Sequence, residues 1–234
     1  MKSSDENLRK RGLATEDEIS KLAGLPQTQL MKQLHSSDAV TRTAAACHLL
    51  ARDRACALEL LRQLANEKCL YTKIAICKTL ERGGLDTAIQ MAEFLGKIGN
   101  NQHKVLPDKV SKKKSFPLPR DIIARSLGKM NITVFPALMA ILDSNDMVKI
   151  REGLDAIGFM VFYHQELATF ENVLPVISLL KDYSDDPIIV WKAILCLSAF
   201  PLAESREALL MYSSNADFIS LEAQRSLRLL ENRI

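Results

Sequence analysis

A small residue recurs at one position of a repeated segment, and this recurrence constrains the fold more than any other feature. Six segments align on an apolar or proline anchor at Val40, Leu70, Pro117, Val148, Ile188 and Phe218. Five places after the anchor, all but one carry a small residue: Ala45, Ala75, Gly153, Ala193 and Ala223. Ile122 is the exception. Because a small side chain at a fixed helical position lets a neighbouring helix approach closely, the segments predict stacked helices.

The anchors lie 30, 47, 31, 40 and 30 residues apart, which indicates a short repeat with two longer intervals. Each anchor is preceded by another apolar helix, and two of these carry an early proline, Pro136 and Pro175. Proline is tolerated in the first turn of a helix. Polar turn residues then supply N-caps: Ser37 or Asp38, Asn145 or Asp146, and Asp186. We expect helix pairs at 27–35 with 38–51, 54–65 with 69–82, 85–96 with 119–130, 132–142 with 146–163, 168–182 with 187–200, and 203–213 with 216–232.

The beginning of the chain differs from the rest in composition. Residues 1–14 are polar and charged, so we expect them to be disordered and, lacking an apolar stretch, not to act as a secretory signal. Thr15 and Glu18 form a capping-box pattern that opens a short helix. Aromatic residues make up only 6% of the chain and no long alternating run suggests a strand. The sequence therefore predicts one all-α domain over residues 15–234, with an insertion at about 97–118.

The order of elements resembles a known repeat family. A helix, a short Asp-containing turn and a second helix of the form V-x-x-R-x-G/A-L-x-A-I-G are clearest from Val134 to Gly158 and from Val173 to Phe200. This pattern resembles the HEAT repeat, and the short period is similar to the compact repeats of phycobilin lyases. The resemblance implies a right-handed α-α superhelix, or solenoid, of about six helix pairs. The third repeat departs from it, because it lacks the small residue and carries the insertion.

Residues that could carry chemistry are sparse. No glycine-rich phosphate loop is present, and the four histidines are scattered without metal-ligand or triad spacing. The five cysteines form no CxxC pair, which indicates reduced thiols in a cytoplasmic protein. Cys47 and Cys77 occupy equivalent repeat positions and are interpreted as core residues, not zinc ligands. We expect no catalytic residue, no metal and no cofactor.

One row of positions is a candidate binding surface. Three places after the anchors the repeats carry Lys73, Arg120, Arg151 and Trp191, and Lys192 lies beside the last of these. In HEAT repeats this face of the second helix commonly lines the concave surface, so the resemblance implies a basic row there. Such a row could bind phosphate or an acidic peptide. The other interpretation is an ordinary solvated face.

The insertion is the strongest local signal. Between His103 and Arg120 it carries one acid, Asp108, and a set of candidate binding lysines: Lys104, Lys109, Lys112, Lys113 and Lys114. Its three prolines argue against regular structure. A loop this long inside a compact array is usually functional or disordered. We interpret it as a flexible basic arm or as a variable solvated loop.

These features favour a non-catalytic scaffold that binds a protein partner through its concave face and the basic insertion. The alternative is binding of nucleic acid through its phosphate backbone. That alternative includes a relationship to alkylpurine DNA glycosylases, which resemble this chain in being small, basic HEAT-like proteins. A third function, lyase or chaperone for a prosthetic group, follows only from the compact repeats. No uncharged apolar run approaches the ~18 residues of a membrane span. Neither the partner nor the oligomeric state is indicated.

Overall fold

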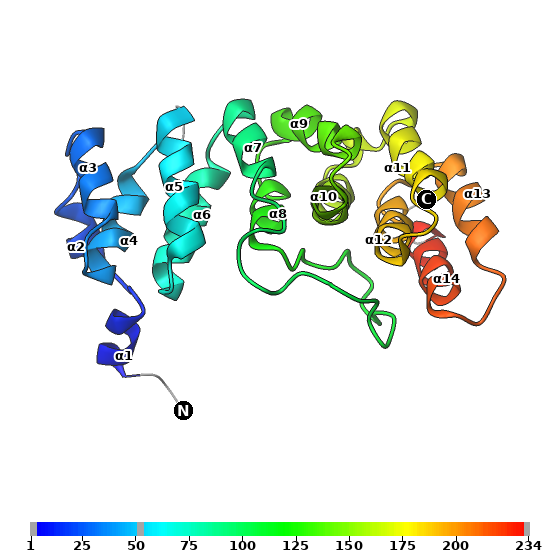
Figure 1. Ribbon diagram of the computed structural model, residues 1–234, viewed down its shortest axis with the longest axis horizontal. Coiled ribbons are helices and arrows are strands. Elements are labelled where there is room, and N and C mark those ends of the chain that lie inside the picture. Colours follow the sequence, from blue (N-terminus) through cyan, green and yellow to red (C-terminus); the bar gives the residue numbers. More distant parts are fainter. Residues whose placement is uncertain (1–3, 51–53, 232–234) are drawn as a thin grey trace.

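The computed structural model describes residues 4–50 and 54–231, and within these ranges it is helical, with no β-strand. The helices from α3 (Gln27–Leu34) onward progress along the longest axis of the molecule in the order of the chain, with α1 (Asp5–Lys10) below one end and α14 (Phe218–Glu231) near the other (Figure 1). The all-α prediction is confirmed.

The second helices of the predicted pairs form one row, called here the second-helix row. It consists of α4 (Ala39–His48), α6 (Leu70–Glu81), α8 (Ile122–Leu127), α10 (Met147–Tyr163), α12 (Pro187–Leu197) and α14. Each of these helices packs on the next, so the row is continuous from α4 to α14. Each also packs on the helix that precedes it in the chain.

The preceding helices form the first-helix row. It consists of α3 (Gln27–Leu34), α5 (Arg54–Asn66), α7 (Leu85–Ala92), α9 (Phe135–Met139), α11 (Phe170–Asp182) and α13 (Ala203–Tyr212). Short 3-10 helices flank α9 at Ile132–Val134 (η1) and Ala140–Asp143 (η2), and another lies at Gln165–Leu167 (η3). Each predicted helix has a counterpart in the described residues, but α7 ends four residues earlier than expected and α8 begins three residues later, so the connection between them is longer than predicted.

The recurrent small residues of the second-helix row are all buried. Ala45, Ala193 and Ala223 have no exposed surface, and Ala75 is also buried. At Gly153 a β-carbon would lie only 2.6 Å from Cγ2 of Ile141, so α10 could not approach η2 with a larger residue there. The predicted close approach is therefore present in the packing.

Three helices begin at the predicted N-caps. Asp38, Asp146 and Asp186 each accept hydrogen bonds from the first-turn N–H groups of α4, α10 and α12. Pro136 lies in the first turn of α9, as expected. Pro175 does not lie in a first turn, because Thr169 caps α11 and the helix begins at Phe170.

The sequence predicts disorder for residues 1–14, but the part of this segment that the structure describes contains a helix. Helix α1 lies there, and Arg9 pairs with Glu18 of α2 (Glu16–Ser20) at 2.7 Å. The main-chain oxygen of Arg11 accepts a hydrogen bond of 3.0 Å from Tyr71. The polar composition suggested disorder, but these polar groups find partners on α2 and α6; residues 1–3 lie outside the described residues. The predicted capping box of Thr15 and Glu18 is present.

No helix in residues 4–50 or 54–231 combines the length and apolar character that crossing a bilayer requires. The same residues contain no cluster of His, Cys, Asp or Glu that could hold a metal ion. None of the five cysteines, all of which lie in these residues, forms a disulfide.

Candidate interaction surface on the basic loop

The predicted insertion forms a long connection between α7 and α8 that contains neither helix nor strand. We call residues 97–120 the basic loop. It passes beneath α10 and reaches the far end of the second-helix row before returning to α8 (Figure 1). It therefore covers part of the row that the sequence predicted to be the binding face.

Three contacts dock the basic loop on this row. Phe116 is only 3% exposed, lies against Gly158 of α10 and contacts the ring of Phe162 at 5.9 Å between centroids. Arg225 of α14 donates hydrogen bonds to the main-chain oxygens of Lys113 and Ser115. The ring of His103 meets that of Trp191 edge-on, with centroids 4.8 Å apart. The insertion packs against the helices and does not extend as a free arm.

The lysines of the basic loop point to solvent. Lys104, Lys109, Lys112, Lys113 and Lys114 are all exposed, and none forms an ion pair with another described residue. Their charges are therefore not neutralised within the described part of the molecule.

A basic cavity lies where the loop meets α14. Its volume is about 440 Å³, and the described residues that line it include no acid. The lining consists of Val110, Ser111, Lys112, Lys113, Lys114, Leu221, Arg225, Arg228 and Leu229. Because cations surround one hollow, the cavity is suited to carboxylate or phosphate groups.

Two of the five candidates predicted on the concave face are buried. Trp191 is 6% exposed, and its indole N–H donates to Glu222 at 3.2 Å. Lys192 is 1% exposed, and its Nζ lies 2.8 Å from Glu152 and 3.0 Å from Asp155. Neither side chain can take part in a solvent-facing basic row.

The other three candidates lie apart from one another. Arg151 forms an ion pair with Asp186, the N-cap of α12. Arg120 is exposed at the end of the basic loop and donates to Nε2 of His103 at 3.1 Å. Lys73 lies on α6 at a second basic hollow. The structure thus brings no continuous row together from the predicted positions.

The second hollow lies between α6 and α8. Its volume is about 250 Å³, and its lining carries four cations and one acid: Lys73, Lys78, Arg125, Lys129 and Glu81. Leu70 and Ile74 lie in the same lining and are each 40% exposed. Cationic and apolar side chains therefore line the same hollow.

The ion cluster around Lys192 was not predicted from the sequence. Burial alone would lower the pKa of the Lys192 ammonium, but Asp155 and Glu152 raise it above its usual value. Burial raises the pKa of Glu152 to about 7 despite the opposing ammonium, since two buried carboxylates share one cation. The sequence feature that could have revealed this cluster is Lys192 itself, because it lies inside the apolar stretch Ile188–Leu197 and a buried charge needs a partner of opposite charge.

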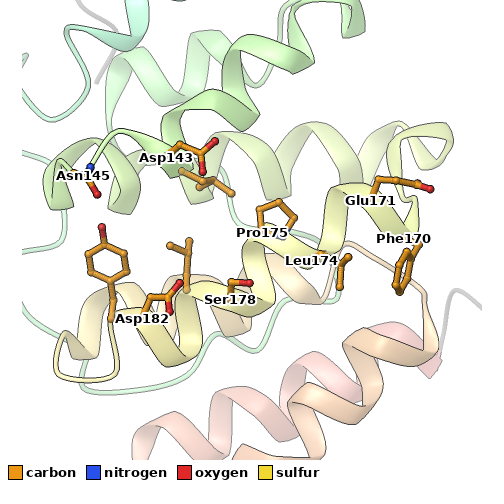
Figure 2. A pocket seen from close by; sticks show the side chains of 11 residues that line it. Asp143, Asn145, Phe170, Glu171, Leu174, Pro175, Ser178 and Asp182 are labelled. Atoms are coloured by element: carbon orange, nitrogen blue, oxygen red, sulfur yellow. The ribbon is translucent and has the colours of Figure 1, made fainter.

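The opposite side of the molecule carries a groove of the other charge. It lies between η2 and α11 and has a volume of about 1080 Å³. Figure 2 shows Asp143 across the groove from Leu174 and Pro175, with Glu171 and Asp182 along α11. No lysine or arginine is among the described residues of its lining. A polyanion is therefore expected at the basic loop and not at this groove.

No protein-family model matches the chain, and a search of curated proteins finds no match. The candidate function therefore rests on the geometry and charge of the surfaces described above.

Proposed function

We propose that this protein is a non-catalytic helical scaffold that binds an acidic segment of another protein at the basic loop. The observation that supports this most is the cavity between the loop and α14, with five cations and no acid in its described lining. A carboxylate entering this cavity would meet Lys112, Lys113 and Lys114, which are exposed and form no ion pair with another described residue. The exposed lysines of the loop would attract such a segment from a distance.

Exposed apolar residues beside the cations favour a protein over a nucleic acid. Leu221 lines the basic cavity and is 46% exposed, and Leu118 of the loop is 49% exposed. At the hollow between α6 and α8, the apolar side chain of Ile74 likewise lies beside cationic side chains. Nucleic-acid backbones offer phosphates but little apolar surface, whereas an amphipathic acidic helix offers both carboxylates and leucines.

The architectural part of the proposal is that the two rows form a right-handed superhelix of about six HEAT-like pairs. Such arrays present extended surfaces and have no inherent reaction centre, which suits a scaffold. We also propose a cytoplasmic location with no cofactor; the location is supported by cysteines that form no disulfide in a chain without CxxC spacing. The binding face is the exposed surface of the loop together with α6 and α8.

Fluorescence anisotropy with three labelled probes tests the proposal. The probes are an acidic helical peptide with leucines on one face, its Leu→Ser counterpart, and a DNA duplex of similar charge. We expect the leucine peptide to bind at least tenfold more tightly than the serine peptide. Substitution K112Q/K113Q/K114Q should weaken this binding, while the control variant Lys21→Gln, on an exposed site away from the loop, should not.

Nucleic-acid binding is the outcome that would replace this proposal. It would appear as tighter binding of the duplex than of the leucine peptide, with a steep loss of affinity as salt rises. A glycosylase-like reaction has less support, because Trp191 lies under the loop and Asp155 is paired with Lys192. No feature of the described surfaces specifically favours a lyase or chaperone for a prosthetic group.

A further inference from the structure

A separate cavity lies underneath the basic loop, between the loop and α10, α12 and α14. Its volume is about 240 Å³. The walls combine the Trp191 side chain, prolines of the loop and Leu195 with the polar groups of His103, Asp155 and Arg225. An apolar cavity of ~150 Å³ is known to hold a benzene ring, so a single-ring molecule fits this space.

The protonation state of His103 follows from its neighbour. The Arg120 guanidinium carries only donors, so the 3.1 Å contact requires Nε2 of His103 to accept. The proton of a neutral imidazole must then lie on Nδ1. Burial lowers the pKa of His103, and the Lys192 and Arg120 cations add to this, which agrees with a neutral ring.

The Nδ1–H donor of His103 is buried, and no described residue accepts its hydrogen bond. Its edge-on contact with the Trp191 ring is a weak substitute, because N–H···π contacts are second-order interactions. Leaving a buried donor without an acceptor is costly. The ring is therefore suited to a molecule that supplies an acceptor.

A second buried donor lines the same cavity. Arg225 is only 4% exposed, and its Nη1 and Nη2 atoms bind Glu222 and the loop carbonyls. Its Nε–H finds no acceptor among the described residues. Both carboxylates in the lining already have cations, since Asp155 pairs with Lys192 and Glu222 with Arg225. Lys109 and Arg120 add positive charge that no described acid neutralises.

We propose that this cavity binds a small planar carboxylate, whose oxygens accept from His103 and Arg225 while its apolar body lies against Trp191. The two donors call for an acceptor, and the surrounding cations favour a negative charge. The apolar walls distinguish a ring-bearing carboxylate from phosphate, which would leave them without contacts. This site is distinct from the proposed surface for an acidic protein and does not depend on it.

Trp191 is the only tryptophan in the chain, so its fluorescence reports directly on the cavity. Benzoate should change the emission saturably, with a dissociation constant of about 1 mM or tighter. Benzamide, the neutral molecule of the same shape, and inorganic phosphate should each bind at least tenfold more weakly. A linear, unsaturable fluorescence response to benzoate, or equal binding of benzamide, would overturn the proposal. This test needs only the unaltered protein.

A matched pair of variants locates the site. His103→Phe keeps a ring against Trp191 but removes the Nδ1–H donor, so benzoate binding should weaken at least tenfold. Val105→Ala changes a neighbouring loop residue that is 74% exposed and does not line the cavity, so it should leave the affinity unchanged. Undiminished binding in a folded His103→Phe variant would show that benzoate binds elsewhere.

Discussion

Arg225 of α14 donates a hydrogen bond of 3.0 Å to the main-chain oxygen of Lys113, which lies 112 positions earlier in the chain. This contact holds the lysine-rich part of the loop at the last helix of the row. It also makes Arg225 a common wall of the basic cavity and of the cavity beneath the loop. The two proposed sites therefore both depend on the docked position of the loop.

Removing the main apolar anchor should release the loop. Phe116→Ala creates a void at a 3% exposed position, and such losses cost roughly 3–5 kcal/mol in a core. Since few other contacts dock the loop, we expect it to detach before the helices unfold. Limited trypsin digestion should then cleave after Lys112–Lys114 several-fold faster. The control Val105→Ala, at a 74% exposed loop position, should digest like the parent protein; an equal rate in Phe116→Ala would contradict the docking.

The buried cation of α12 should be essential to stability. Lys192→Met leaves Glu152 and Asp155 buried without their partner, which typically costs about 3–5 kcal/mol. Urea unfolding followed by circular dichroism measures this loss. The triple variant K192M/E152Q/D155N removes all three charges and should recover part of it. If Lys192→Met is as stable as the parent protein, the cluster is not buried.

Acid should weaken the junction of α4 and α6 through one carboxylate. Burial would raise the pKa of Glu67, but hydrogen bonds from Arg42, the Cys69 N–H and Gln63 outweigh it and lower that pKa to about 2. The folded state therefore gains stability from the ionised form above the ordinary value of 4.5, and loses it as the pH falls toward 2. The total is at most about 3 kcal/mol.

The Glu67→Gln variant tests this pH dependence. The free energy of unfolding of the parent protein, measured in urea, should fall more steeply between pH 5 and about pH 2 than that of Glu67→Gln. Parallel pH profiles would show that the Arg42–Glu67 ion pair, at 2.8 Å in the structure, does not control acid stability.

The small position of the repeats should not tolerate a large side chain. Ala193 has no exposed surface, so Ala193→Phe overpacks α12 and should cost roughly 1–3 kcal/mol. This corresponds to a fall in melting temperature of about 2–4 °C for each kcal/mol in a chain of this size. Ala203→Phe, at an exposed position of α13, serves as the control and should melt near the parent temperature.

Local features were predictable because their causes are local. The caps at Asp38, Asp146 and Asp186 lie within three residues of the N–H groups they bind, so the turns could be located by residue type. The buried small residues Ala45 and Ala193 followed from helical periodicity alone.

The candidate site was less predictable because its contacts join distant parts of the chain. Neither periodicity nor composition could pair Arg225 with Lys113, or place His103 on Trp191. The exposure of the loop lysines was predictable, because a run of like charge stays in solvent, and their role in binding stays a prediction. Lys192 was wrongly predicted to lie on an exposed binding face. That prediction came from the repeat spacing alone, which carries no information about the loop and the carboxylates that enclose the side chain.

Site-specific photocrosslinking tests the proposed function most directly. Benzoylphenylalanine at Val110, which lines the basic cavity, keeps every lysine, and the same group at Leu174 reports on the acidic groove across the molecule. After irradiation in a lysate of the source cells, mass spectrometry identifies the adducts. The account predicts that Val110 captures an acid-rich, leucine-containing segment of another protein that Leu174 does not. Adducts at Val110 only with nucleic acid, or with no protein at all, would contradict it.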